Sequence, residues 1–271
     1  MNMENIRDFY SKKKVLITGH TGFIGSWLTK WLTMLDAEVC GYSLDPPTRP
    51  NMYDLLNLGD SVTDIREDIR NREAIQKVLL DFNPEIVFHL AAQPVVLESY
   101  DNPVDTFDVN VTGTVNLLNE VRKVGSAKVI TVMTSDKSYR NNEWVYPYRE
   151  NDVLGGKDPY SASKSCQDIV VNSFRESYFY HSGIALSSIR AGNVIGGGDW
   201  APFRIIPDLV RDLLFQLRLH RKYQLGYRKI LKRLVAQRDG KQSLVEIHLW
   251  SFVRGLYYER PPSYLRFLIQ V

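Results

Sequence analysis

Cysteine is scarce in this sequence, and long apolar runs are missing. Cys40 and Cys166 are the two cysteines among 271 residues, and neither has neighbours at metal-ligand spacing. We therefore expect two thiols in a reducing compartment rather than a disulfide or a metal site. The first residues form no apolar signal segment, and no stretch reaches membrane-spanning length. These absences favour a cytoplasmic protein that binds no membrane.

A strong excess of charge of one sign is also missing, since the formal net charge is +3 at pH 7. The balance is uneven along the chain, because residues 211–271 hold 13 Lys or Arg against 4 Asp or Glu. Apolar residues interrupt this basic tail throughout, and no nucleic-acid-binding motif accompanies it. We expect no nucleic-acid partner.

Short apolar segments alternate with helical patterns from the N-terminus to about residue 195. The strand candidates are residues 15–18, 38–44, 85–90, 128–133 and 185–190. Helical periodicity covers residues 23–35, residues 103–123 and the segment that holds Tyr160 and Lys164. Strands separated by helices form crossover connections, which require a parallel sheet covered on both faces. The sequence predicts an α/β fold with a doubly wound parallel sheet of the Rossmann type.

A glycine-rich turn follows the first predicted strand and opens the first helix. It consists of Gly19, His20, Thr21, Gly22, Phe23, Ile24 and Gly25. Glycines permit a tight turn and a close backbone approach, so the helix N-terminus can face a pyrophosphate. Glycine also serves ordinary turns, and it is the strand-turn-helix context that favours a dinucleotide site.

Asp45 ends the second predicted strand, about twenty residues after the turn. A carboxylate there accepts a hydrogen bond from a ribose 2′-hydroxyl and repels a 2′-phosphate, which favours NAD over NADP. A simple turn before Pro46 is the alternative interpretation, and Arg49 leaves NADP open. Further cofactor contacts are expected at Asp68 and Ile69, after a strand that precedes them, and at Leu90, Ala91 and Ala92, where the predicted strand 85–90 ends. We interpret the histidines His20 and His89 as structural rather than metal-binding.

Tyr160 and Lys164 lie one helical turn apart in the string Tyr-Ser-Ala-Ser-Lys. A free phenol titrates near 10, and a neighbouring cation favours the phenolate, which can take a proton from an alcohol. The same spacing occurs on many amphipathic helices whose lysine lies at the surface. The functional interpretation therefore depends on the rest of the pattern.

A second string, Thr134-Ser135-Asp136-Lys137, follows the apolar segment 128–133. Oxidation of an alcohol needs only Tyr160 and Lys164, whereas elimination of water needs a further acid and base. Asp136 and Lys137 supply such a pair, although a solvated ion pair at a strand end is the alternative. Together the two strings predict oxidation followed by dehydration.

Several strings occurring together resemble the extended short-chain dehydrogenase/reductase superfamily, and within it the nucleotide-sugar 4,6-dehydratases. They are residues 19–25, 89–93, 110–114, 134–137, 160–164 and 190–200. The resemblance implies a bound NAD, a nucleotide-sugar substrate (CDP-glucose above others) and a place in the biosynthesis of deoxysugars and lipopolysaccharide. It also implies a homodimer, in which the helices from Pro103 and Tyr160 pair as a four-helix bundle.

The same resemblance gives each catalytic residue a role. Tyr160 takes the proton of the sugar 4-hydroxyl while C4 gives hydride to NAD. Lys137 then removes the C5 proton, provided that burial and cationic neighbours keep part of it neutral. Asp136 protonates the departing 6-hydroxyl and Ser135 hydrogen-bonds the 4-oxygen. Substrate contacts are expected at Gln93, Asn193 and Arg204.

The resemblance ends at about Asp212, and Pro202-Phe203 stands where the family has acidic residues. We expect residues 1–200 to form the NAD-binding domain with the catalytic residues. Residues 201–271 are expected to form a partial or divergent substrate region. A frameshifted or truncated coding sequence is the favoured explanation of the tail, with a divergent substrate lid as the alternative. A nucleotide-sugar 4-epimerase and a non-catalytic NAD-binding remnant are the competing functions.

Overall fold

The computed structural model describes residues 3–223. The chain divides into two units, Met1–Phe203 and Arg204–Val271. The first contains a sheet and its helices, and the described part of the second is helix α9, Ile205–Tyr223, with Arg204 before it. Residues 224–271, most of the segment expected to be frameshifted or divergent, lie outside the described residues.

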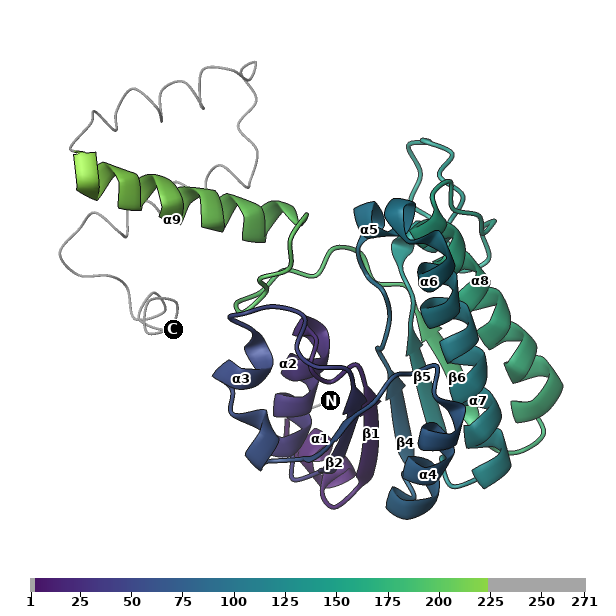
Figure 1. Ribbon diagram of the computed structural model, residues 1–271. Coiled ribbons are helices and arrows are strands. Elements are labelled where there is room, and N and C mark those ends of the chain that lie inside the picture. Colours follow the sequence, from purple (N-terminus) through teal and green to yellow (C-terminus); the bar gives the residue numbers. More distant parts are fainter. Residues whose placement is uncertain (1–2, 224–271) are drawn as a thin grey trace. The chain divides into compact units, whose positions relative to one another are not determined.

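The first unit is built on six parallel strands in the order β3-β2-β1-β4-β5-β6 (Figure 1). Their bounds are β1 Lys14–Thr18, β2 Glu38–Ser43, β3 Thr63–Arg66, β4 Ile86–His89, β5 Val129–Met133 and β6 Ala185–Ile189. Strands β1, β2 and β3 follow one another toward one edge of the sheet. The chain then crosses back to β4, which lies on the other side of β1, and β5 and β6 continue toward the opposite edge. This order is that of a doubly wound Rossmann-type sheet, so the predicted fold class is confirmed.

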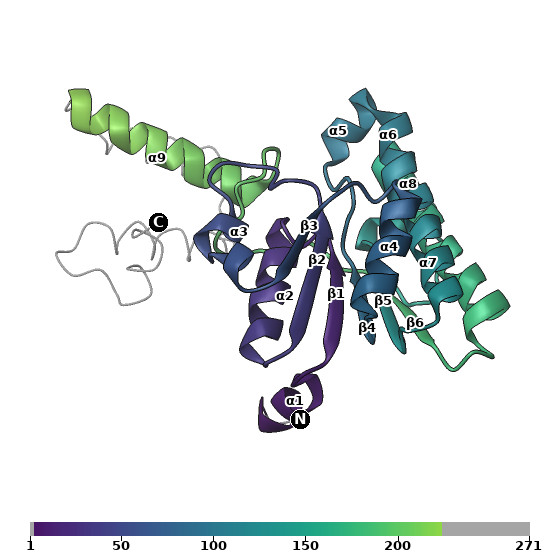
Figure 2. The ribbon, with the colours of Figure 1, turned by 60° about the horizontal axis from the view of Figure 1, so that its bottom comes forward.

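Helices cover the sheet on two sides, and Figure 2 shows α2 on one side with α4, α7 and α8 on the other. Their bounds are α1 Met3–Tyr10, α2 Phe23–Met34, α3 Met52–Leu55, α4 Arg72–Phe82, α5 Val96–Asp101, α6 Pro103–Phe107, α7 Gly113–Val124 and α8 Pro159–Phe174. Short 3-10 turns cover Leu58–Asp60 and Asp136–Ser138, and π-helical turns cover Asp108–Thr112 and Arg175–Phe179. Within residues 3–223 no helix is long and apolar enough to cross a bilayer.

Strand alternation divides the core into two clusters. On β1, Val15 and Ile17 pack in the cluster that includes Leu32 of α2. Leu16 lies between them in sequence and packs in the larger cluster, with Leu79 of α4 and Leu117 of α7. Successive side chains of a strand point to opposite faces, so one apolar strand contributes to both layers. Because the strands are parallel, the loops that follow their carboxyl ends all lie along the same edge of the sheet.

The expected continuous helix over residues 103–123 is interrupted. A π-helical turn, Asp108–Thr112, separates α6 from α7. Asn110 in this turn is fully buried, and its side chain accepts a hydrogen bond from Gln93 N (2.8 Å) and donates to Ser163 Oγ (2.9 Å). These contacts lie outside the helix, so helical periodicity alone cannot reveal them. The interruption thereby joins α8 to the loop after β4.

Candidate active site

The glycine-rich turn forms a tight cradle at the end of β1. Gly19 has φ +76°, and a Cβ there would lie 2.7 Å from Ala91 N. A Cβ at Gly25 would overlap the Gly19 carbonyl. Helix α2 begins after Gly22, whose residue type supplies no side-chain cap for the first N–H groups. Those N–H groups are therefore available to an anionic ligand, as a pyrophosphate site requires.

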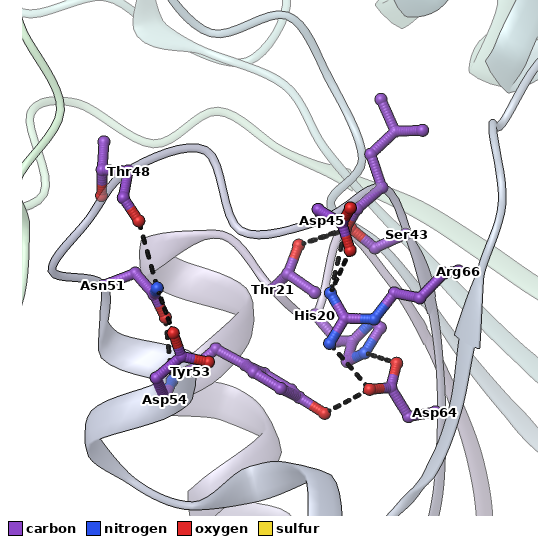
Figure 3. A network of polar contacts seen from close by, with 11 residues as sticks. His20, Thr21, Ser43, Asp45, Thr48, Asn51, Tyr53, Asp54, Asp64 and Arg66 are labelled. Carbon is purple, nitrogen blue, oxygen red and sulfur yellow. Dashed lines mark hydrogen bonds and ion pairs between the residues drawn. The ribbon is translucent and has the colours of Figure 1, made fainter.

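His20 of the turn belongs to a polar network that also involves β3 and α3 (Figure 3). Its Nε2 lies 2.9 Å from Asp64 Oδ1, and Tyr53 donates a hydrogen bond to Asp64 Oδ2 at 2.6 Å. Arg66 donates to the same Oδ2 at 2.7 Å and lies over the Tyr53 ring. Burial lowers the pKa of His20, although Asp64 opposes this shift. The structural interpretation of His20 missed Asp64, because only strand pairing brings that carboxylate near.

The residues expected around the adenosine half of a dinucleotide all follow strand ends. Asp45 comes after β2, its side chain is 92% exposed, and its Oδ1 lies 3.8 Å from Arg66 Nη1. Thr21 shares a hydrogen bond with Ser43 at 2.7 Å and donates to Leu44 O. Asp68 accepts hydrogen bonds from Arg70.

The next residue, Ile69, is buried against Gly113, where a Cβ would lie 2.8 Å from an Ile69 methyl carbon. Tyr42 donates to the Asp68 carbonyl at 2.7 Å, so β2 holds this loop in place. Loops after parallel strands meet at one edge of the sheet. Asp45 and the Asp68-Ile69 pair accordingly belong to the same edge as the glycine turn.

The loop after β4 is held by the end of β1. Thr18 Oγ1 accepts hydrogen bonds from the backbone N–H groups of Leu90 and Ala91, both at 3.2 Å. Ala92 is half-buried next to them. Gln93, expected to contact substrate, donates from Nε2 to Thr106 Oγ1 (2.9 Å) and accepts from Val95 N at its Oε1. Both ends of its amide therefore support the loop.

The acid and amine of the second string lie in the turn after β5. Buried Ser135 begins the 3-10 turn, accepts from Lys137 N at 3.2 Å and donates to Asp136 Oδ1 at 3.1 Å. Asp136 N donates to Ala191 O at 3.0 Å, which sets the carboxylate beside the loop that continues to Asn193. Asp136, Lys137 and Asn193 are exposed. The burial expected to keep Lys137 partly neutral is therefore not provided by the described residues.

Helix α8 carries the tyrosine and lysine of the first string. Asp158 caps the helix by accepting from Ser161 N at 2.9 Å, and Pro159 occupies the first turn. Tyr160 is 8% exposed and Lys164 is 3% exposed. Lys164 Nζ donates to Met133 O at 3.2 Å.

That bond joins the two strings, because Met133 is the last residue of β5, directly before Thr134. Lys164 Nζ also donates to Gln167 Oε1 at 2.9 Å. Burial lowers the pKa of Lys164 to about 8, while Asp168 opposes the shift. A buried cation one turn from Tyr160 is the arrangement that favours a phenolate.

Asp168 and Arg190 are further residues that the sequence did not single out. Arg190 Nε donates to buried Asp168 at 3.1 Å, and its guanidinium lies 4.7 Å from the Tyr139 ring centroid. Arg190 Nη1 also donates to the Glu150 carbonyl at 2.8 Å. The arginine thus connects α8 with the loop that follows the Asp136 turn. The i, i+4 spacing of Lys164 and Asp168 was the available sequence signal.

Two further predictions concern a substrate contact at Arg204 and the structural role of His89. Arg204 begins the second unit, where its carbonyl accepts from Asp208 N at 2.9 Å, and its contact with substrate stays a prediction. Among the residues that the structure describes, no group of three or more His, Cys, Asp or Glu side chains could hold a metal ion. His89 instead lies between two threonine hydroxyls, at 2.7 Å from Thr18 and 2.9 Å from Thr114.

Comparison with known proteins identifies the family of this chain. A sequence model of the GDP-mannose 4,6 dehydratase family matches residues 16–206. The chain belongs to this family. A relative in Salmonella typhimurium, CDP-glucose 4,6-dehydratase, is 50% identical over 211 residues, which are 76% of this chain and 59% of the relative.

Two epimerases are more distant. UDP-glucose 4-epimerase of Mycolicibacterium smegmatis is 32% identical over 68% of this chain and 56% of its own length. The solved structure of Thermus thermophilus UDP-glucose 4-epimerase, a complex with NAD, is 30% identical with a TM-score of 0.59, over 69% of this chain and 58% of that one. The chain thus spans less than two thirds of the length of each of these relatives.

Proposed function

We propose that this chain is an NAD-dependent nucleotide-sugar 4,6-dehydratase, which converts CDP-glucose to CDP-4-keto-6-deoxyglucose. The observation that carries the proposal is the hydrogen bond from Lys164 to Met133 O. It places the tyrosine helix directly beside the turn that holds Asp136 and Lys137. The 50% identity to the Salmonella enzyme supports CDP-glucose as the substrate.

The residues at the sheet edge fit a dinucleotide. Gly19 and Gly25 allow a tight turn in which a Cβ at either position would collide with backbone, and α2 presents uncapped N–H groups toward a pyrophosphate. Asp45 is exposed and would accept a hydrogen bond from the ribose 2′-hydroxyl, which supports NAD. Bound NAD would supply the hydride acceptor for C4 and the hydride donor for C6.

This chain's own residues would then move the protons. Tyr160 takes the 4-hydroxyl proton, with the buried Lys164 ammonium stabilising its phenolate, and Ser135 hydrogen-bonds the 4-oxygen. Ketone formation at C4 acidifies the C5 proton, which Lys137 removes. Asp136 protonates the departing 6-hydroxyl. The exposure of Lys137 means that substrate itself must bury the amine for this step.

Substrate contacts are proposed at Gln93, Asn193 and Arg204. Asn193 follows the Ala191-Gly192 backbone that lies against Asp136, and a Cβ at Gly192 would be 3.5 Å from Asp136 Oδ2. A sugar whose C6 is near Asp136 would therefore lie close to this loop. The Gln93 amide keeps a second N–H and a second lone pair beyond its loop hydrogen bonds, and these would contact the sugar.

A cytoplasmic homodimer that serves deoxysugar and lipopolysaccharide biosynthesis completes the proposal. Exposed apolar side chains on the helices of the expected four-helix bundle support it, among them Val104 of α6 (81% exposed) and Ile169 of α8 (56% exposed). Such side chains are typical of helix faces that a second copy covers. Light scattering coupled to gel filtration would measure the assembly, and a Val104→Glu, Ile169→Glu variant should be monomeric.

Product mass tests the proposed reaction. The chain is incubated with CDP-glucose and NAD, and the product is examined by mass spectrometry and by the alkaline absorbance of a 4-keto sugar. Loss of one water supports the dehydratase. An isomer of unchanged mass that chromatography separates from CDP-glucose would identify a 4-epimerase, the activity named for the Mycolicibacterium relative. Binding of NAD without turnover of any sugar nucleotide would point to a non-catalytic remnant and would contradict the proposal.

A further inference from the structure

A chain of buried hydrogen bonds leads away from Lys164 on the side of α7. Lys164 Nζ donates to Gln167 Oε1 at 2.9 Å, and Gln167 Nε2 donates to Thr114 Oγ1 at 2.8 Å. Gln167, Thr114 and His89 are all 0% exposed. Because water does not reach these groups, each donor and acceptor depends on its protein partner.

The proton positions in this chain are determined by counting hydrogens. Thr114 has a single hydroxyl hydrogen, which it donates to Asn110 O at 2.7 Å. Its oxygen must therefore accept from the other two partners, Gln167 Nε2 and His89 Nε2. His89 consequently carries its proton on Nε2.

The other nitrogen of His89 completes the chain at β1. Thr18 Oγ1 already accepts from Leu90 N and Ala91 N, and it lies 2.7 Å from His89 Nδ1. Thr18 therefore donates its hydrogen to Nδ1, which can accept only in a neutral ring. Burial, together with the charge of Lys164, lowers the pKa of His89 to about 3, which agrees with a neutral ring.

This network leaves one orientation for the Gln167 amide. Turning the amide over would place its NH₂ group against the Lys164 ammonium and its oxygen against Thr114, whose only hydrogen is already donated to Asn110. We propose that Gln167 is a positioning residue, held by Thr114 and neutral His89, which presents an oxygen acceptor to Lys164 and so fixes the direction of its ammonium. The proposal rests on the proposed function for its catalytic meaning, since Lys164 acts there on Tyr160.

The two ends of this hydrogen-bond network lie at residues with proposed functions, which a purely structural role of Gln167 would not explain. One end is Lys164, and the other is Thr18, the residue directly before Gly19 of the cofactor turn. Thr18 also holds the backbone of Leu90 and Ala91. The network therefore fixes the position of Lys164 relative to the loops expected to hold the dinucleotide.

The test follows the titration of Lys164 itself, by NMR of the full chain with isotope-labelled lysine side chains. A Lys164→Arg spectrum identifies the signal. Gln167→Met keeps the volume and removes the acceptor for the ammonium, and it should lower the titration midpoint by about one pH unit. Gln167→Glu keeps an acceptor and adds a negative charge, and it should raise the midpoint by about as much. Lys164 midpoints that shift in the same direction in the two Gln167 variants, or that do not shift in either, would overturn the proposal.

Variants at Thr114 provide a second test by the same titration. Thr114→Val removes the hydroxyl that orients Gln167 and should lower the Lys164 midpoint, whereas Thr114→Ser keeps the hydroxyl and should restore it. Ser165→Ala is the matched control, because Ser165 is buried on the same helix and bonds to Ser138 O and Ser161 O outside this network. It should weaken stability without moving the midpoint. Equal shifts in Thr114→Val and Ser165→Ala would show a general loosening of α8 and reject the positioning role.

The nearby titratable groups are Tyr160 and Asp168 on α8, His89 on β4, and Asp136 and Lys137 in the turn after β5. None of them is changed in these variants, so their influence is common to all spectra. The NMR readout needs neither substrate nor turnover. If the chain leaves CDP-glucose unchanged while the midpoints shift as expected, the proposed function fails and the positioning role of Gln167 stands.

Discussion

His20 Nε2 and Asp64 Oδ1 lie 2.9 Å apart, although His20 belongs to the turn after β1 and Asp64 belongs to β3. Strand β2 runs between these two strands, and its residue at this level, Gly41, is paired in register with Asp64. The imidazole reaches its carboxylate by lying over the glycine. The glycine-rich turn is thereby tied to β3, the edge strand of the sheet.

Replacing Gly41 with alanine should break this relationship. A Cβ at Gly41 would overlap the His20 ring, which cannot move away without leaving Asp64. We expect a loss of about 2 kcal/mol in the free energy of unfolding, measured by urea denaturation. Gly59→Ala is the control, since a Cβ there meets only Tyr53 Oη at 3.5 Å. Equal stability of the two variants would contradict the role of Gly41.

The buried neutral His89 should make stability depend on pH. An unfolded histidine has a pKa of about 6.5, and burial lowers the pKa of folded His89 to about 3. Between these values the unfolded chain binds one more proton, so stability is complete above about pH 6.5 and falls by about 1.4 kcal/mol per pH unit below it. Urea denaturation between about pH 7 and 5 measures the slope. It should be reduced in His89→Gln and retained in the exposed control His181→Gln.

Arg190→Met should leave Asp168 buried without its main cation. The Asp168 side chain is 2% exposed and keeps a hydrogen bond from Ser188 at 2.8 Å. We expect a loss of about 3 kcal/mol in stability. The loop over residues 139–154 should also become more sensitive to limited proteolysis, because Arg190 holds Tyr139 and the Glu150 carbonyl. Arg140→Met, which changes an exposed arginine of the same loop, should have neither effect.

Asp45→Ala should weaken the preference for NAD over NADP. The exposed carboxylate near Arg66 would no longer repel a 2′-phosphate, and Arg66 would be available to it. We expect the ratio of the two dissociation constants, measured by calorimetry, to fall about tenfold, equivalent to about 1.4 kcal/mol. Asp60→Ala, at another exposed aspartate, should leave the ratio as it is in the parent chain. An unchanged ratio in Asp45→Ala would show that residues other than Asp45 determine the preference for NAD over NADP.

Asp136→Asn should separate oxidation from dehydration. An amide cannot protonate the departing 6-hydroxyl, whereas Tyr160 and Lys164 remain in place for the first step. Reduced nicotinamide should therefore accumulate on addition of CDP-glucose, with formation of the dehydrated product slowed about a hundredfold or more. Absorbance and product mass measure the two steps. Undiminished dehydration would remove Asp136 from the role of acid, and the exposed control Asp81→Asn should behave as the parent chain.

Much of the fold was predictable from local pattern. Short apolar runs such as Val15–Thr18 identify parallel strands because both of their faces are buried, and a glycine-rich turn before Phe23 marks the start of a helix. The break in the helix after Phe107 was not predictable. Helical periodicity continues through Asn110, and only its buried partners on α8 and in the loop after β4 distinguish the π-helical turn.

The candidate site divides in the same way. Tyr160 and Lys164 were predictable because an i, i+4 pair on one helix is a local relationship, and so was the acid-amine pair after β5. The sequence by itself thus determined the fold class and located the glycine-rich turn and the two strings that are proposed to be catalytic. Only the tertiary structure decided that Lys164 reaches Met133, that Asp64 supports His20, and that Gln167 faces the ammonium. These contacts depend on strand order and on which side of α8 meets α7, and such long-range packing is not encoded in the spacing of any one segment.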